Sequence, residues 1–473
     1  MDQVMPIPNA VMKLLDLLPE NATPYLVGGC VRDWLLGIAI KDFDIEVFNI
    51  SMDKLIRILS KHGRTDTVGR SFGVIKWTPC KGETYDIAIP RKETKTGDGH
   101  QGFDIETDPQ LDPRIAASRR DYTINSIMYD LRKHAIIDAF GGQSDLENRR
   151  LKHTSDAFSE DPLRVMRGVQ FAARFGMCGD PATLELCRSI RNQFNQLPPE
   201  RLWNEWYKWA SQSRFPSKGL QFLADSGWLE NFPELAALRH TPQDPEWHPE
   251  GNVWNHTNHC CDSLAGEFDW ISATSPEDRA VWMFAVLLHD IGKPDTTERT
   301  MRKGIERIVS PGHDKIGAKI ADLFLKKLKA PNILRARVCP LVSEHMIHLQ
   351  TITNRAVRRL SKRLEPESIP SLCLVMAADA MGRPPLEPNI PKFIEQLRIQ
   401  AAELEVLTKA PIPFLRGNDL IQMGLPSGKE IGALLHQAYE LQIEGELEDR
   451  SQALQWARQC ISPRRAYTAS NET

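Results

Sequence analysis

The sequence has no apolar run long enough to cross a membrane, and its first residues, Met-Asp-Gln-Val-Met-Pro, do not join a basic segment to an apolar one. These absences argue against a transmembrane segment and against a secretory signal. The nine cysteines are scattered without a paired spacing, and Cys260 and Cys261 are adjacent rather than forming a Cys-x-x-Cys pair. Such usage is typical of reduced thiols, so the sequence predicts a cytoplasmic protein with no membrane partner.

Net charge is also nearly absent. The 59 lysines and arginines and the 62 acidic residues give a formal charge of −3, which by itself gives no indication of nucleic-acid binding. Basic residues are nevertheless concentrated between Arg114 and Arg174, and a local basic surface can bind a phosphate backbone on a slightly acidic protein. At 473 residues the chain exceeds one ordinary core, so we expect about three or four domains.

Residues 25–48 predict a strand that ends at two glycines, a short helix beginning near Val31, and a second strand holding Asp42 and Asp44. Because alternate side chains of a strand point to opposite faces, Asp42, Asp44 and Glu46 share one face, and the apolar residues between them share the other. Two neighbouring carboxylates on a strand can hold a pair of divalent ions, which stabilise the attacking and leaving oxygens of a phosphoryl or nucleotidyl transfer.

The two glycines, Gly28 and Gly29, allow a polyphosphate to approach the backbone at a helix N-terminus, and Arg32 adds a charged donor. The pattern Gly-Gly-x-Val-Arg-Asp-x-Leu-Leu-Gly followed by Asp-x-Asp resembles the head of the class II nucleotidyltransferases, the family of CCA-adding enzymes and bacterial poly(A) polymerases. The resemblance implies catalytic Asp42 and Asp44 that bind Mg²⁺, and a triphosphate held by Gly28, Gly29 and Arg32.

Two later segments of the head allow further predictions. Residues 84–89 alternate like a strand, and Asp86 is either a third carboxylate facing the metals or an edge-strand residue facing water. Residues 91–112 are rich in Gly, Asp, Lys and Thr, which predicts a mobile loop. The start of this segment resembles the flexible loop that the family uses when it incorporates the terminal adenosine.

Nucleotide recognition is implied by two motifs. Residues 119–126, Arg-Arg-Asp-Tyr-Thr-Ile-Asn-Ser, resemble a family motif in which Arg120 would contact the phosphates or sugar of the incoming nucleotide. Asp161, Arg164 and Arg167 follow at three-residue spacing on one face of a predicted helix. They match the Glu-Asp-x-x-Arg motif whose Asp and Arg read the Watson–Crick edges of C and A, so that protein replaces a nucleic-acid template.

One position departs from the family. Gln170 stands where the family commonly has Arg, which removes a cation near the nucleotide and affects how the site holds CTP and ATP. The segment Pro-Glu-Arg-Leu-Trp-Asn-Glu resembles the last motif of the head and neck, and we expect Glu200, Arg201 and Glu205 to brace the recognition helix rather than contact substrate.

A second motif, Leu-Leu-His-Asp-Ile-Gly-Lys-Pro at residues 287–294, resembles the HD phosphohydrolase superfamily. Imidazole and carboxylate ligands together suit a divalent transition metal such as Ni²⁺ or Mn²⁺, or Mg²⁺, better than a Cys-rich zinc site. His313 and His345 either bind a second metal or the phosphate, or are surface or supporting histidines. The metal ligands that the resemblance implies are His256, His289, Asp290 and Asp379.

The predicted fold class is α+β, with a nucleotidyltransferase head of mixed β-sheet and helices followed by a mostly α-helical chain. The last residues, 464–473, are polar and are expected to be disordered. The predicted domains are the head at 1–150, a helical neck with the nucleotide-selecting motif at 151–240, an HD phosphohydrolase domain at 241–395, and a helical tail at 396–473.

The resemblance spans nearly the whole chain and implies a CTP(ATP):tRNA nucleotidyltransferase that adds or repairs the 3′-terminal CCA of tRNA. One alternative is a poly(A) polymerase, but these tend to carry Gly-Arg-Arg-Phe where this chain has Gly-Arg-Ser-Phe at 69–72, and Ser71 favours CCA addition. An enzyme that adds only C or only A is another alternative.

HD domains fused to this head resemble 2′,3′-cyclic phosphodiesterases, 2′-nucleotidases and phosphatases, so the sequence also predicts a second, hydrolytic activity. The alternative from another class is a metal-dependent phosphohydrolase that uses the head as an RNA-binding module. A non-enzymatic tRNA-binding scaffold would require both sets of metal ligands to be idle, and their completeness argues against it.

Overall fold

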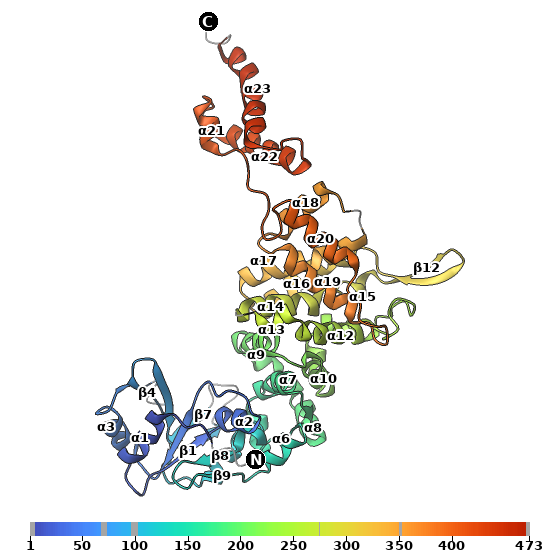
Figure 1. Ribbon diagram of the computed structural model, residues 1–473. Helices are drawn as coiled ribbons and strands as arrows, with labels where there is room; N and C mark the ends of the chain where they lie inside the picture. The colour runs from blue at the N-terminus through green and yellow to red at the C-terminus, as the bar shows by residue number, and fades with distance from the viewer. Residues whose placement is uncertain (1–4, 68–72, 96–102, 274, 350–351, 470–473) are drawn as a thin grey trace. The chain divides into compact units, whose positions relative to one another are not determined.

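The computed structural model describes residues 5–67, 73–95, 103–273, 275–349 and 352–469. The chain folds into two compact units, Met1–Pro233 and Glu234–Thr473 (Figure 1). The first unit holds the β-sheet predicted for the head, and the second is largely helical, so the α+β prediction is confirmed. The division of the chain into four domains stays a prediction.

A seven-stranded mixed sheet forms the base of the first unit. Its strands pair antiparallel except for β2 with β5, which run parallel. The apolar side chains that alternate along these strands are buried, among them Ile45, Val47 and Ile87. The strand order is β3 (Arg64–Thr67), β4 (Val74–Cys80), β5 (Glu83–Ala88), β2 (Asp44–Phe48), β1 (Thr23–Val27), β8 (Met128–Asp130) and β9 (Ala135–Ile137).

The predicted strand, helix and strand at 25–48 are present, with one correction. Helix α2 (Gly29–Leu35) follows β1 and begins two residues earlier than expected. Strand β2 begins at Asp44, so Asp42 precedes the strand instead of lying in it. The reason is that the β1 ladder ends at the pair Val27 and Asp44, after which Gly28 turns the chain away and leaves residue 42 without a partner on β1.

The mobile loop predicted for residues 91–112 is wrong for residues 91–95 and 103–107, which form strands. Strands β6 (Arg91–Lys95) and β7 (Phe103–Thr107) form an antiparallel ribbon with five residue pairs. Each arm satisfies the backbone N–H and C=O groups of the other, and a composition rule based on polar residues does not detect this pairing. Residues 96–102, between the two strands, lie outside the described ranges.

The helical part of the first unit is built on α7 (Leu163–Phe175), which packs against α9 (Pro199–Gln212) and α10 (Pro216–Asp225). Gly168 lets α7 approach the head closely, because a Cβ atom there would lie 2.1 Å from the Tyr122 hydroxyl. The Tyr122 hydroxyl also donates to the Arg164 carbonyl at 3.0 Å. These contacts fix the face of α7 that carries Arg164 and Arg167.

The second unit is a helical bundle in which α12 (Val253–Gly266) packs against α14 (Pro276–Leu288) and α19 (Ile369–Met381), and α16 (His313–Lys327) packs against α17 (Asn332–Glu344). A hairpin of β12 (Glu298–Arg302) and β13 (Ile305–Val309) stands out from these helices (Figure 1). Within the part of the chain that the structure describes, no helix combines the length and the apolar character that a bilayer crossing needs.

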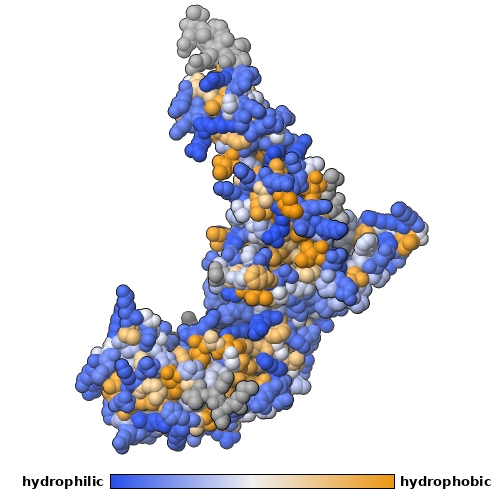
Figure 2. Space-filling view, viewed as in Figure 1, coloured by the Kyte–Doolittle hydropathy of each residue, from blue (hydrophilic) through white to orange (hydrophobic). Residues whose placement is uncertain are grey.

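The last four helices of the chain are α20 (Lys392–Glu403), which packs on α18 (Asn354–Leu364) and α19, then α21 (Gly417–Gln422), α22 (Lys429–Glu444) and α23 (Arg450–Ala469). Leu420, Leu434, Ala457 and other buried residues of the last three helices form an apolar cluster of their own. Helix α23 continues to Ala469, so the disorder predicted from residue 464 is wrong up to that point. Hydrophilic side chains cover most of the visible face of the protein, with smaller hydrophobic patches (Figure 2).

Candidate functional site

Three carboxylates gather where β2 begins, on the interior strands of the head sheet. Asp44 on β2 is paired in register with Asp86 on the parallel strand β5, and Asp42 lies two residues before Asp44. Desolvation, together with the charges of Asp86 and Asp42, raises the pKa of Asp44, whereas Arg120 lowers it. Asp86, for which the sequence allowed two interpretations, is therefore beside Asp44, where its Oδ1 also accepts from Lys76 at 3.1 Å.

The turn at Gly28 and Gly29 lies directly beside Asp44. Gly28 has φ +73°, and a Cβ atom on it would lie 2.9 Å from Arg120 Nη1 and 3.8 Å from Asp44 Oδ2. A side chain at Gly28 would therefore both strain the backbone and fill the space between the cation and the carboxylate. Arg120 Nη2 lies 3.4 Å from Glu46 Oε2, on the face of β2 that also carries Asp44.

A cavity of about 540 Å³ opens above these residues, and its lining is strongly cationic. Eight arginine and lysine side chains and three aspartates line it, which suits a polyanionic ligand such as a nucleoside triphosphate. The predicted residues in the lining are Gly28, Gly29, Arg32, Asp44, Arg120, Asp161, Arg164 and Arg167. Arg119, Asp121, Asn125, Gln170, Phe171, Arg174, Arg201, Lys208 and Gln212 complete it, and Asp42 does not line it.

Arg32 is more enclosed than the sequence indicated. Its side chain donates from Nε and Nη2 to Asp33 Oδ1 at 2.8 and 2.6 Å, and from Nη1 to Asn125 Oδ1 at 2.6 Å. The guanidinium also lies over the ring of Phe175, 4.6 Å from its centroid. These contacts hold Arg32 in the wall of the cavity, where it fixes the neighbouring groups as well as adding charge.

Arg167 is held by a partner that sequence reasoning missed. Its Nε donates to Asp121 Oδ2 at 2.6 Å, and Asn125 donates to the other oxygen at 2.8 Å. Burial alone would raise the pKa of Asp121, but the Arg167 charge and these hydrogen bonds lower it to about 2. The signal available in the sequence was that Asp121 and Asn125 are four residues apart in the motif that contains Arg120.

The other two nucleotide-selecting candidates lie at the start of α7. Arg164 donates to the carbonyls of Ala157 and Arg119, each at 2.8 Å, which fixes its guanidinium at the cavity wall. Asp161 precedes the helix and accepts from Arg201 at 3.1 Å. Arg201 therefore braces Asp161, as predicted, although it also lines the cavity. Gln170 lies on the same wall and is buried.

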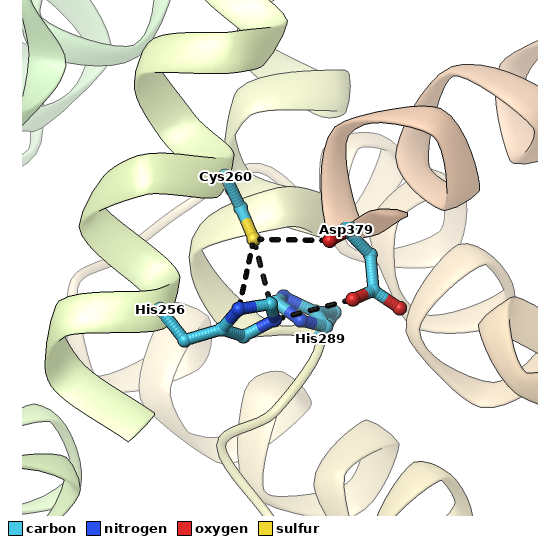
Figure 3. A group of neighbouring side chains, drawn as sticks. All are labelled: His256, Cys260, His289 and Asp379. Atoms are coloured by element: carbon cyan, nitrogen blue, oxygen red, sulfur yellow. Dashed lines mark hydrogen bonds and ion pairs between the residues drawn. The ribbon is translucent and has the colours of Figure 1, made fainter. Parts of the chain in front are cut away.

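The histidines and aspartates of the second unit come together in a buried cluster. His256 lies on α12, His289 and Asp290 follow the end of α14, and Asp379 lies on α19. His256 Nε2 is 3.2 Å from Asp379 Oδ1 and 3.7 Å from Asp290 Oδ2. His289 Nε2 is 3.3 Å from Asp290 Oδ2. The four residues predicted as metal ligands are thus brought close together from the ends and faces of three helices. Figure 3 shows three of them, His256, His289 and Asp379.

His313 and His345 face the second oxygen of the same aspartate. Their Nε2 atoms lie 3.3 and 3.9 Å from Asp290 Oδ1, and 3.2 Å from each other. Both side chains are buried, so neither is a surface histidine. Asp290 separates two donor groups, one containing His256 and His289 and the other containing His313 and His345, and either group could hold an ion.

The imidazoles are oriented alike. The Nδ1 atoms of His289, His313 and His345 each lie 2.7 Å from the carbonyl three residues earlier, and His256 Nδ1 lies 2.7 Å from Glu250 Oε1. A hydrogen on Nδ1 leaves the Nε2 lone pair available as a metal ligand. His289 Nε2 makes no hydrogen bond although it is buried. This chemistry of donors fits a divalent metal.

Four residues around the cluster were missed from the sequence. Glu250 accepts from His256 and lies 2.9 Å from His248 Nδ1, and these hydrogen bonds lower the Glu250 pKa to about 2 against the opposing effect of burial. Lys293 Nζ lies 2.7 Å from Asp290 Oδ2. The Cys260 thiol lies against His256. The His-x-Glu pattern upstream of His256 is visible in the sequence, but nothing in its spacing links it to the predicted metal ligands.

Comparisons with known proteins find a matching family for the head and another for the helical second unit. A model of the poly A polymerase head domain matches residues 24–152, and a model of the HD domain matches residues 252–383. The multifunctional CCA protein of Acinetobacter baumannii (strain SDF) is 31% identical over 442 residues, covering 91% of this chain and 98% of that protein. The chain belongs to the multifunctional CCA protein family.

Other members and solved structures extend this result. The multifunctional CCA protein of Xylella fastidiosa (strain 9a5c) is 34% identical over 427 residues, covering 88% of this chain and 95% of its own length. The CCA-adding enzyme of Bacillus stearothermophilus in complex with CTP has a TM-score of 0.62 at 20% identity, covering 97% and 98% of the two chains. That of Thermotoga maritima with tRNA has a TM-score of 0.58 at 18% identity, covering 96% of each. The chain therefore shares the fold of these two CCA-adding enzymes.

Proposed function

We propose that this protein is a CTP(ATP):tRNA nucleotidyltransferase that adds or repairs the 3′-terminal CCA of tRNA. The observation that carries the proposal is the cationic cavity whose floor holds the Asp44 carboxylate beside Asp86 and Asp42. The relatives named multifunctional CCA proteins support it, as do structures of CCA-adding enzymes described with CTP, ATP and tRNA.

The carboxylates of Asp42 and Asp44, with Asp86 beside them, are hard oxygen donors that fit Mg²⁺. Bound there, Mg²⁺ would supply charge that stabilises the attacking and leaving oxygens at the α-phosphate as pyrophosphate departs. The protein's own contribution is positional. The Gly28–Gly29 turn leaves room for the triphosphate, and Arg120 lies beside that turn, where it would orient the phosphates.

Base selection is assigned to Asp161, Arg164 and Arg167, which line the cavity at the start of α7. Carboxylate acceptors and guanidinium donors can satisfy the edges of both C and A with different geometries. Asp121 keeps Arg167 charged and fixed, so the side chain needs little reorganisation when a base arrives. Gln170, in the same wall, is neutral, so the nucleotide meets less positive charge there than it would beside the Arg that the family commonly has at this position.

A poly(A) polymerase or a partial enzyme remains the alternative within the superfamily, and the segment 69–72 that bears on it lies outside the described residues. Extension of a tRNA lacking its terminus, with CTP and ATP supplied separately and together, tests the proposal. We expect C addition with CTP alone and completion only with both nucleotides. Long A-tails without C addition would contradict it.

A second activity, hydrolysis of phosphate esters, is favoured by the buried cluster in the second unit. Its Nε2 atoms and carboxylates fit a divalent transition ion such as Ni²⁺ or Mn²⁺, or Mg²⁺, held by His256, His289, Asp290 and Asp379. Bound there, the ion would supply Lewis acidity to a phosphate ester. The test is metal-stimulated release of phosphate from 2′-AMP or opening of a 2′,3′-cyclic phosphate. If hydrolysis is found without any nucleotide addition, the protein is a phosphohydrolase that uses its head to bind RNA.

A further inference from the structure

A sulfur atom lies inside the donor cluster of the second unit. Cys260 is one helical turn after His256 on α12, is fully buried, and points its Sγ at the His256 imidazole (Figure 3). Sγ lies 3.3 Å from His256 Nε2, the atom from which Asp379 Oδ1 is 3.2 Å away. The thiol therefore faces the same nitrogen as the predicted carboxylate ligand.

The donor atoms of the cluster are of the kinds, and at the distances, that allow them to bind one ion together. One donor atom each from His256, Cys260, His289 and Asp379 lie within 4.8 Å of one another. Around a tetrahedral ion with metal–nitrogen and metal–sulfur bonds of about 2.0 and 2.3 Å, donor atoms are about 3.3–3.5 Å apart. His289 Nε2, which belongs to the same group, is buried and makes no hydrogen bond, and the carboxylate oxygen Asp290 Oδ2 is 3.3 Å away from it.

The end of α19 fixes the sulfur in this position. A Cβ atom at Gly382 would lie 2.4 Å from Cys260 Sγ and 2.8 Å from the Cys260 nitrogen, so only glycine lets the two helices approach so closely. The Gly382 carbonyl also lies 3.1 Å from His256 Nδ1. The same residue thereby supports both the thiol and the imidazole. Cys261, the next residue on α12, is buried as well but belongs to none of the donor groups.

We propose that Cys260 is a further ligand, as a thiolate, of the ion assigned above to His256, His289, Asp290 and Asp379. The thiol proton is released to solvent as the sulfur–metal bond forms. Thiolate is a soft ligand, so the site favours ions such as Ni²⁺, Co²⁺ or Zn²⁺ over the hard ion Mg²⁺. The inference rests on the proposed metal-binding role of the cluster, but not on the reaction that the metal serves.

Cobalt provides a direct test. The full-length protein is stripped of metal under reducing conditions, titrated anaerobically with Co²⁺, and followed by absorption spectroscopy. We expect visible ligand-field bands together with an intense near-ultraviolet sulfur-to-cobalt band in the wild type and in Cys261→Ser. Cys260→Ser should lose the near-ultraviolet band, keep the visible bands, and bind Zn²⁺ at least about tenfold more weakly.

The outcomes separate the two proposals. Visible bands without the near-ultraviolet band in the wild type, or persistence of that band in Cys260→Ser, would overturn the thiolate ligand while leaving the metal site intact. Absence of all bands would overturn both. If Cys260→Ser does not fold, X-ray absorption of the wild-type zinc form decides: one sulfur at about 2.3 Å supports the inference, and a shell of only nitrogen and oxygen refutes it. Co²⁺ at the head carboxylates cannot give a sulfur band.

Discussion

Asp44, which lines the cationic cavity of the first unit, is paired in register with Asp86 across the parallel strands β2 and β5. The pairing means that an aspartate 42 residues along the chain contributes to the field at Asp44, whose pKa is raised by burial and by this neighbour. Neighbouring carboxylates repel one another, and a cation that binds between them removes this repulsion. The nucleotidyl transfer proposal therefore includes Asp86.

Replacing Asp86 by Asn should reduce the rate of CMP and AMP addition by on the order of a hundredfold, because it removes one acceptor for Mg²⁺ without changing the shape of the side chain. Single-turnover extension of tRNA at several Mg²⁺ concentrations measures the effect. Asp66→Asn, on β3 with a side chain 54% exposed, is the matched control and should leave the rate unchanged. An Asp86→Asn enzyme of full activity would remove this residue from the metal site.

Gly28→Ala should raise the KM for CTP and ATP by on the order of tenfold, because the new Cβ would lie 2.9 Å from Arg120 Nη1 in the space assigned to the triphosphate. Gly37→Ala is the control that separates backbone strain from the filling of the triphosphate space. Gly37 also has a positive φ, +68°, but nothing lies within 4 Å of its Cβ position. Both variants should lose similar stability in urea unfolding, and only the first should change the KM. Equal KM values would contradict the assignment of the turn.

Asp121→Asn should lower the free energy of unfolding of the first unit by about 2 kcal/mol at pH 7, since the pKa of Asp121 is about 2 in the folded protein against an ordinary 3.8. A carboxyl group with a depressed pKa stabilises the folded state at any pH above its pKa in the unfolded chain. This stabilisation is lost as the pH falls through the pKa in the folded protein. The wild type should therefore lose this contribution between about pH 4 and pH 2, and the variant should not. Urea unfolding at pH 7 and pH 3 measures it.

The control for that variant is Glu185→Gln, which breaks an ion pair with Arg188 on the surface of α8 (Pro181–Ser189). Its side chain is 74% exposed, so the loss of stability at pH 7 should be under about 1 kcal/mol. If both variants behave alike, the Asp121–Arg167 pair does not have the strength inferred from its burial.

His289→Ala should abolish release of phosphate from 2′-AMP and leave CCA addition at the wild-type rate, because His289 belongs to the cluster of the second unit and the nucleotide cavity belongs to the first. His259→Ala, an exposed histidine of α12, is the control and should retain both activities. Loss of CCA addition in His289→Ala with an unchanged circular dichroism spectrum would show that the two activities are coupled.

Glu250→Gln should weaken metal binding at the cluster by about ten- to a hundredfold, because Glu250 accepts from His256 Nδ1 at 2.7 Å and thereby orients Nε2 toward the ion. Equilibrium dialysis against Zn²⁺, with bound metal measured directly, tests the effect without reference to activity. Glu246→Gln, whose side chain is 58% exposed, should bind as the wild type does. An unchanged affinity in Glu250→Gln would mean that Glu250 does not position His256.

Sequence reasoning located the parts of each site that are encoded locally. Alternation along β2 separates Ile45 and Val47 from Asp44, and the helical spacing of Arg164 and Arg167 places both on the cavity side of α7. These predictions hold because they depend only on the period of one element.

What the sequence did not reveal depends on contacts between distant segments. The ribbon of β6 and β7 forms because two polar arms satisfy each other's backbone, and neither arm indicates its partner. Asp42 precedes β2 because the β1 ladder ends at Val27. Cys260 is one helical turn from His256, but the donor group of His256, Cys260, His289 and Asp379 forms only when α12 packs against α14 and α19.

Stepwise extension of a tRNA lacking its last three nucleotides tests the central claim most directly, with Asp44→Ala measured beside the wild type. We predict two additions with CTP alone, one further addition when ATP is supplied, and no addition by a folded Asp44→Ala protein. Undiminished addition by Asp44→Ala, or A-tails formed without C, would contradict the account.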